Sequence, residues 1–411
     1  MRDLRSRVDG TLTWLRGPVP TSIVLAFLIG ALFIAVAGQS PATVYSAMFT
    51  GSLGSPLGLA STLQRAIPLI GMALAIAVAF RAGVLNLGGE GQFILGGLAA
   101  GVVALSMPGP APLVTLTAVV AGIAAGALWA SLGALLQLWP GVPLLITTLL
   151  LSYPARYFAS WVVRFPLKDP ESSMVATRPI SESVQIPLLG AKGSPLGDTL
   201  VATFGKDHVL TVLGRSLNWS LLIVIVLVAL VVFMNRRTVH GFEAGLNGLN
   251  PAFTRYSGVR TNWLMVRTML MSGGIAGLMG ALLTVGAPNI RIIDGALLNT
   301  NYAWTGLLVA LLALYRPAGV VVAGLFFAAI TAGSVAMGRD LSMSPQIASV
   351  IQGIVIILIA IRVQIPWRTR RPQASPPADP VAPEATDATV VAASTPSSAQ
   401  ELSADDSTGR I

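Results

Sequence analysis

The sequence contains repeated runs of about 18 or more apolar residues without an internal charge, the length that spans a bilayer as an α-helix. The runs are continuous and do not alternate between apolar and polar residues, which favours helices over a β-barrel. Only 10% of the 411 residues are charged, whereas soluble domains usually carry about 25%. The sequence therefore predicts an all-α integral membrane protein.

The apolar runs predict ten transmembrane spans, at about residues 19–37, 59–80, 93–106, 113–138, 144–163, 209–234, 264–285, 302–315, 319–337 and 347–361. A cytoplasmic N-terminus places the arginines beside these spans, such as Arg81, Arg236, Arg237 and Arg316, on the cytoplasmic side, as the positive-inside rule requires. We therefore expect a multi-pass protein of the bacterial plasma membrane with both termini in the cytoplasm. Spans two to five and seven to ten are predicted to form two inverted four-helix repeats, on span count alone.

Three regions follow from this arrangement: a basic cytoplasmic N-terminus at 1–18, a transmembrane domain at 19–365 and a cytoplasmic tail at 366–411. The tail is rich in Pro, Ala, Ser and Thr and is predicted to be disordered. Within the domain, an external loop is expected at about 164–208 and a cytoplasmic loop at about 238–260. The net charge of +9 is assigned to membrane orientation, not to nucleic acid binding. The chain has no Cys and two His, so no metal site is predicted.

The densest polar cluster beside the membrane is the segment Arg81–Gln92, which contains Asn86, Glu90 and Gln92. Its glycines loosen the helix and expose backbone groups. In one interpretation, the polar side chains bind a solute in a covered cavity. In the other, the segment is a solvated cytoplasmic turn in which Glu90 pairs with Arg81. The residues alone leave both interpretations open.

A second constellation covers Gly241–Gly258, where Asn250 is a good N-cap and Pro251 suits the first helical position. Gly258 can end this helix in the left-handed conformation. We expect a short rigid helix outside the membrane, with an apolar face made by Phe242, Leu246, Leu249 and Phe253. That face either docks on a partner protein or packs on its own domain.

Together these segments resemble the permeases of bacterial ABC importers for nucleosides, which are related to those for ribose and branched-chain amino acids. Residues 81–92, Arg-Ala-Gly-Val-Leu-Asn-Leu-Gly-Gly-Glu-Gly-Gln, are similar to the motif (R/K)AGLFNIGAEGQ. Residues 145–153 and 163–170 are similar to ITTIMLNY and RGPLKDP, and residues 242–258 to the coupling loop FELRAVGLNPEAARYAGI. The resemblance covers about residues 20–365.

The resemblance implies a permease subunit, not an enzyme, that translocates a small polar solute, with a nucleoside as the first candidate and ribose or a branched-chain amino acid as the alternative. The implied partners are an ABC ATPase, a second permease in a heterodimer, and an extracytoplasmic binding lipoprotein. ATP would bind the ATPase, since this chain lacks a Gly-x-x-x-x-Gly-Lys-Ser/Thr loop and needs no cofactor of its own. The predicted substrate-pathway residues are Asn86, Glu90 and Gln92, from the polar segment, and Asn301 and Trp304, from a segment that departs from the family pattern. The implied ATPase-coupling residues are Glu243, Gly248, Asn250, Pro251 and Arg255.

Several positions depart from the family pattern. Gly245 replaces an Arg and Asn247 an apolar residue in the coupling loop, and Ser152 stands where Asn is usual. The segment from Asn301 to Thr305 also differs, which leaves the substrate open.

Two other classes are less compatible with the sequence. An ion-coupled secondary transporter needs ionisable groups inside the membrane, and the spans are predicted to hold almost none, with Arg65 and Asp294 near span ends. A membrane enzyme would need a cluster of His, Asp or Glu on one helical face, and no such cluster is evident.

Overall fold

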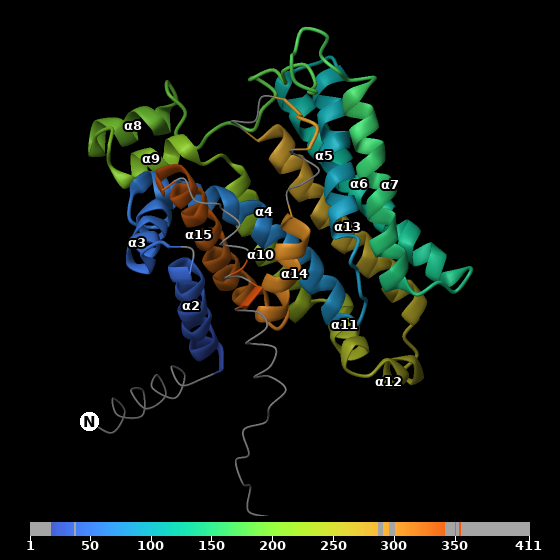
Figure 1. Cartoon of the computed structure of the whole chain (residues 1–411). Helices are drawn as coiled ribbons and strands as arrows, with labels where there is room; N and C mark the ends of the chain where they lie inside the picture. The colour runs from blue at the N-terminus through green and yellow to red at the C-terminus, as the bar shows by residue number, and fades with distance from the viewer. Residues whose placement is uncertain are drawn as a thin grey trace, which may run out of the picture. The chain divides into compact units, whose positions relative to one another are not determined.

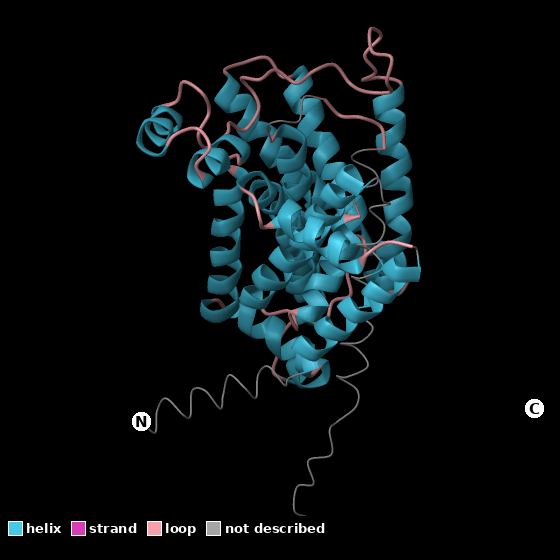
Figure 2. Ribbon diagram, turned by 60° about the vertical axis from the view of Figure 1, so that its left-hand side comes forward, coloured by secondary structure: helices cyan, strands magenta, loops and turns pink. Residues whose placement is uncertain are grey.

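The computed structural model describes residues 18–36, 38–286, 291–295, 301–341, 350 and 353–354. The chain divides into two units, Met1–Ile365 and Pro366–Ile411, and every described residue lies in the first. Within these residues the secondary structure is helical apart from four isolated β-bridges (Figure 2). The predicted tail and basic N-terminus lie outside the described residues, apart from Pro18, and stay predictions.

The described helices, with the labels of Figure 1, are α2 (Pro18–Val36), α3 (Pro41–Ser52), α4 (Pro56–Arg81), α5 (Gly89–Ser106), α6 (Ala111–Leu138), α7 (Leu144–Arg164), α8 (Pro195–Phe204), α9 (Val209–Ser216), α10 (Ser220–Arg237), α11 (Val239–Leu249), α12 (Pro251–Tyr256), α13 (Thr261–Val285), α14 (Tyr302–Leu312) and α15 (Pro317–Leu341).

Proline begins several of these helices because its missing N–H costs nothing at the first helical position. Side-chain caps add to this signal: the Ser55 hydroxyl accepts a hydrogen bond from the Gly58 amide, and the Thr238 hydroxyl accepts one from the Gly241 amide. Local sequence therefore determines where α4 and α11 begin.

The helices α4 and α13 form the centre of the bundle (Figure 1). In the most apolar stretch of each, 78% of the residues are buried, compared with 28% in α6 and 22% in α10. Helices α6 and α10 therefore present most of their apolar surface outwards, as expected for helices that face lipid.

Close helix packing around α13 depends on glycine. A Cβ at Gly277 would overlap the carbonyl oxygen of Gly122 on α6, and a Cβ at Gly96 on α5 would overlap the Gly277 backbone. Small residues let helix backbones approach each other where lipid offers no hydrophobic driving force. The contacts of α13 with α5 and α6 are the most extensive in the described part of the chain.

Six described helices are long and apolar enough to cross a membrane: α4, α5, α6, α10, α13 and α15. Helices α2 and α3 pass this test together as one bent pair, with 119° between them. The 21-residue α7 has the length of a span but carries Arg156 within it, and α14 has only 11 residues. The tenth predicted span lies almost wholly outside the described residues, so ten spans and the inverted repeats stay predictions.

Two predicted boundaries differ from the structure. No helix was predicted between the first two spans, at 19–37 and 59–80, but this segment contains the helix α3, whose Val44 and Met48 are buried. The sixth span was expected to begin at Val209, but that residue begins the separate helix α9, and the long helix begins at Ser220. Apolar composition alone could not show the break between them.

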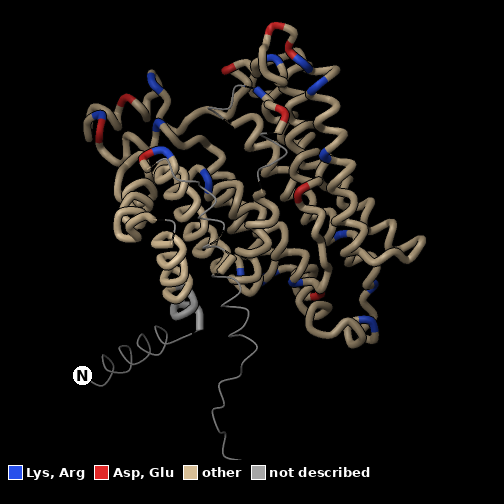
Figure 3. The backbone as a smooth tube through the Cα atoms, viewed as in Figure 1, with Lys and Arg blue, Asp and Glu red and all other residues tan. Residues whose placement is uncertain are grey.

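Charged residues gather at the two ends of the helical bundle, and few lie along its middle (Figure 3). The end that carries α11 and α12 is opposite the end that carries the long connections after α7 (Figure 1). A charge-poor middle between two charged ends is the pattern expected of a protein that crosses a bilayer.

Candidate functional site

The segment between α4 and α5, residues 82–88, is not helical and is largely buried. Buried backbone N–H and C=O groups outside a helix require hydrogen-bond partners. The Leu87 amide donates to the Thr148 hydroxyl (3.1 Å), and the Gly88 amide donates to the Asn86 Oδ1 atom (3.0 Å). The motif that contains Thr148 on α7 therefore holds this segment in place.

Asn86 and Gln92 form a reciprocal amide pair, with both hydrogen bonds 3.0 Å long. The Asn86 amide also donates to the Ser272 hydroxyl on α13 (2.9 Å), and that hydroxyl donates to the Ala75 carbonyl on α4 (2.8 Å). All four residues are buried. This network joins α4, α5 and α13. Asn86 and Gln92 therefore stabilise the packing of these helices beside the cavity described next.

Glu90, in the first turn of α5, forms an ion pair with Arg156 of α7 and accepts a hydrogen bond from the Trp304 indole N–H (3.1 Å). The Glu90 side chain is 8% exposed and that of Arg156 is 35% exposed. These three residues line a cavity of about 280 Å³ together with Leu87, Leu149, Ser152, Tyr153 and Asn301. The cavity offers a paired charge, hydroxyl groups and aromatic rings.

Asn301 and Trp304 lie at the start of α14, which is the part of this helix that borders the cavity. Asn301, which precedes the helix, has the left-handed backbone conformation (φ 53°), which Asn tolerates better than most residues. Trp304 lies in the first turn that follows. The unusual segment from Asn301 to Thr305 thus contributes two of the side chains around the cavity.

The structure brings together three of the five predicted pathway residues, Glu90, Asn301 and Trp304, at one cavity. The alternative of a solvated turn with a Glu90–Arg81 pair is wrong, since Glu90 is buried and pairs with Arg156. Sequence reasoning missed Arg156, although an Arg inside an apolar run is a signal in itself. Ser152, one helical turn before Arg156, lines the same cavity.

The predicted coupling loop forms two helices, α11 and α12, where one was expected. The capping prediction is confirmed: Asn250 Oδ1 accepts from the Phe253 amide (3.0 Å), Pro251 begins α12 and Gly258 has a positive φ (85°). Arg255 is exposed and Glu243 is half-buried. Neither forms an ion pair with another described residue.

An apolar surface crosses these two helices. Phe242, Leu249, Phe253 and Tyr256 are exposed, with Leu249 and Tyr256 exposed by 87% and 92%. Leu246 is partly buried. We call the four exposed residues the α11–α12 surface.

The loop is also joined to the end of α4. The Asn247 amide donates to the Ala82 carbonyl (2.8 Å), and a Cβ at Gly248 would overlap the Arg81 carbonyl oxygen. The Arg81 guanidinium lies beside Gly245, at a position where a Cβ would have only 3.1 Å of space. Gly245 and Asn247 are the two coupling-loop positions that depart from the family motif. Both therefore lie against Arg81 and Ala82, the start of the stretch of chain that leads to Glu90.

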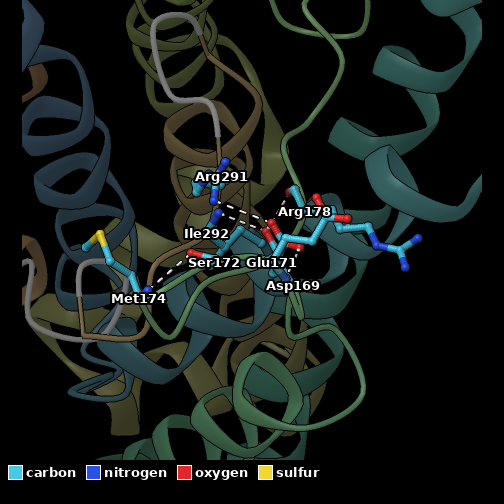
Figure 4. Close-up of polar contacts among 8 residues, drawn as sticks. Asp169, Glu171, Ser172, Met174, Arg178, Arg291 and Ile292 are labelled. Atoms are coloured by element: carbon cyan, nitrogen blue, oxygen red, sulfur yellow. Dashed lines mark hydrogen bonds and ion pairs between the residues drawn. The ribbon is translucent and has the colours of Figure 1, made fainter.

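At the other end of the bundle, the connection after α7 is attached to residues 291–295. Arg291 pairs with Asp169 (3.5 Å), and Asp169 also accepts a hydrogen bond from the Glu171 amide (Figure 4). Arg164 pairs with Asp294. These contacts give the predicted external loop a fixed position on the domain.

Membrane-length helices around a polar cavity are the arrangement expected of a membrane transport protein. The chain belongs to the family described as the branched-chain amino acid transport system permease component, which matches residues 58–360. It is a multi-pass membrane protein and the permease of an ABC importer, a non-catalytic subunit that works with an ATPase and a binding protein.

Several relatives are similar to it over most of their length. The nucleoside ABC transporter permease protein NupB of Lactococcus lactis is 29% identical over 83% of this chain and 89% of its own. The guanosine ABC transporter permease protein NupP of Bacillus subtilis is 29% identical over 82% and 91%. The glucose ABC transporter permease protein TsgB13 of Haloferax volcanii is 28% identical over 84% and 87%.

Arg156→Gln removes the partner of the buried Glu90 carboxylate. We expect a loss of about 3 kcal/mol of unfolding free energy, at the lower end for a buried pair because Arg156 is partly exposed. The charge-swapped double variant Glu90→Arg, Arg156→Glu should recover part of this loss. Thermal unfolding of the purified protein in detergent measures both.

The control is Arg339→Gln, which breaks the exposed pair with Asp340 and should change stability by less than about 1 kcal/mol. Equal small losses for Arg156→Gln and Arg339→Gln would contradict a structural role for the Glu90–Arg156 pair.

Proposed function

We propose that this chain forms one half of the translocation path of a nucleoside importer. The observation that carries the proposal is the cavity at Glu90, Arg156 and Trp304. The paired charges supply hydrogen-bond donors and acceptors without a net charge, which suits an uncharged polar solute. Trp304 and Tyr153 supply aromatic surface for a flat ring.

The names of the relatives support a nucleoside, because two of them are named for a nucleoside or for guanosine. A sugar is one alternative, because one relative is named for glucose. A branched-chain amino acid is the other, because the family description names it. An aliphatic side chain would gain little from so polar a cavity, so the amino acid is the weaker alternative.

The path is proposed to be completed by a second permease, as in a heterodimer. Tyr153 and Trp304 line the cavity yet are both exposed at its edge, as is part of Arg156. A second subunit placed against α7 and α14 would cover this edge. In this proposal Glu90, Asn301 and Trp304 contact the solute, while Asn86 and Gln92 support Glu90.

The coupling loop is proposed to dock on the ATPase through the α11–α12 surface. This surface exposes four large apolar side chains at one end of the helical bundle. Glu243 and Arg255 would make the polar contacts, and Gly248, Asn250 and Pro251 would set the loop's shape. Movement of α11 would reach Glu90 through Arg81 and Ala82, which α11 contacts directly.

The remaining parts of the proposal concern orientation. Ten spans with both termini in the cytoplasm place α11 and α12 inside and the 164–208 loop outside, where the binding protein would dock. The arginines in the last turns of α4 and α10 support this orientation.

Uptake by the complete transporter in proteoliposomes tests the solute. Unlabelled nucleosides should compete with labelled guanosine at least about tenfold better than glucose, ribose or leucine, since a site built for one polar solute rejects others strongly. Uptake should require ATP and should persist when ion gradients are collapsed. Competition by glucose or leucine alone would overturn the nucleoside assignment.

The coupling role is tested by Glu243→Arg, with Glu243→Gln as the matched control. The Arg variant should reduce ATP-driven uptake at least about tenfold, through like-charge repulsion or loss of a polar contact at the ATPase interface. Binding-protein docking should remain, as measured by co-purification. Full uptake by Glu243→Arg would contradict the assigned interface.

A further inference from the structure

A second polar cavity of about 280 Å³ lies between α4, α10, α13 and α14. Its polar lining consists of Ser61, Gln64, Arg65, Asn218, Ser220 and Tyr302. None of these residues lines the Glu90 cavity. A solute in this cavity would therefore contact a different set of residues from a solute in the Glu90 cavity.

Two groups that line it lack hydrogen-bond partners in the described part of the chain. The Nε atom of Arg65 and the hydroxyl of Ser220 are both buried and unpaired. Buried polar groups are almost always satisfied, and an unsatisfied one is destabilising. No carboxylate is among the described residues that line the cavity, and no described carboxylate pairs with Arg65. The cavity therefore contains two polar groups without hydrogen-bond partners among the described residues, and the positive charge of Arg65.

The position of the cavity suits a solute on its way through the protein. Gln64, which precedes Arg65, donates a hydrogen bond to the Ser216 carbonyl (2.6 Å) at the end of α9. The cavity therefore borders α9, which follows directly after the 164–208 loop where the binding protein is proposed to dock. Tyr302 lines this cavity, while Asn301 and Trp304 line the Glu90 cavity, so the first turn of α14 lies between the two.

The side chains indicate which face of a solute would bind. A guanidinium group offers only donors, in a planar fork that matches two adjacent acceptors. Arginine recognises the O6 and N7 acceptors of guanine in this way, whereas adenine presents an amino donor at the corresponding position. A 6-oxopurine therefore fits Arg65, and a 6-aminopurine would place donor against donor.

We infer that the Arg65 cavity is a second solute-binding position that selects 6-oxopurine nucleosides, such as guanosine and inosine, over adenosine. The inference rests on the proposed nucleoside function and specifies its substrate class. Arg65 donates to the oxo edge of the base, and Ser220 and Tyr302 offer further hydrogen-bonding groups in the same cavity.

The experiment measures uptake of labelled guanosine, inosine and adenosine by proteoliposomes that contain the complete transporter. The wild-type protein should prefer guanosine and inosine over adenosine by about tenfold, the scale of one bidentate arginine contact. Arg65→Gln should reduce uptake of both oxopurines by about tenfold and leave adenosine uptake nearly unchanged. Equal preference for inosine and guanosine assigns the contact to the oxo edge, not to the 2-amino group.

Arg215→Gln is the matched control, because Arg215 is an exposed arginine on α9 outside the cavity lining, and it should retain the wild-type preference. If Arg65→Gln fails to assemble with the ATPase, Arg65→Lys keeps the charge without the planar fork and should still lose most of the preference.

An unchanged preference in the Arg65 variants, or an equal loss for all three nucleosides, would overturn the inference while leaving nucleoside import intact. Selection of inorganic phosphate over nucleosides as a competitor would identify an anion site and overturn it as well. Absence of any nucleoside uptake by the wild-type protein would instead refute the proposed function itself.

Discussion

The structure depends on the burial of non-helical backbone between α4 and α5. Buried N–H and C=O groups of such backbone need hydrogen-bond partners. Asn86 within this segment and Thr148 on α7 accept hydrogen bonds from its backbone amides, while Gln92 on α5 and Ser272 on α13 hold the Asn86 side chain. This network lets α5 begin inside the bundle and places the Glu90 carboxylate in its first turn.

Two further features follow from that arrangement. A buried carboxylate needs a partner, and Arg156 supplies one from the middle of α7. The same non-helical segment begins at Ala82, whose carbonyl accepts a hydrogen bond from the coupling loop. A short stretch of chain therefore contacts the proposed ATPase-binding loop at one end and the proposed solute cavity at the other.

Much of the fold follows from local sequence signals. The central helices α4 and α13 were predicted close to their observed bounds because their apolar runs end at glycine or arginine. The start of α12 followed from Asn250 and Pro251. Helix α3 and the break before α10 could not be predicted in this way, because apolar content does not reveal a turn within a continuous run.

The candidate site was only partly predictable. Glu90 was identified from its polar segment, and Asn301 and Trp304 from a segment that departs from the family pattern. Their meeting at one cavity depends on packing between helices far apart in the sequence. The Glu90–Arg156 pair joins residues 66 positions apart, and no local pattern specifies such a pair. The Arg65 cavity likewise arises from four separate helices.

The central claim is that the solute passes the Glu90 cavity. The chain contains no cysteine, so Ser152→Cys, at a residue that lines the cavity, introduces a single thiol in this subunit. A water-soluble thiol reagent should modify this variant and block uptake, and guanosine should slow the modification. Ser131→Cys, on α6 away from the cavity, should show neither effect. Modification of Ser152→Cys that leaves uptake unchanged would contradict the account.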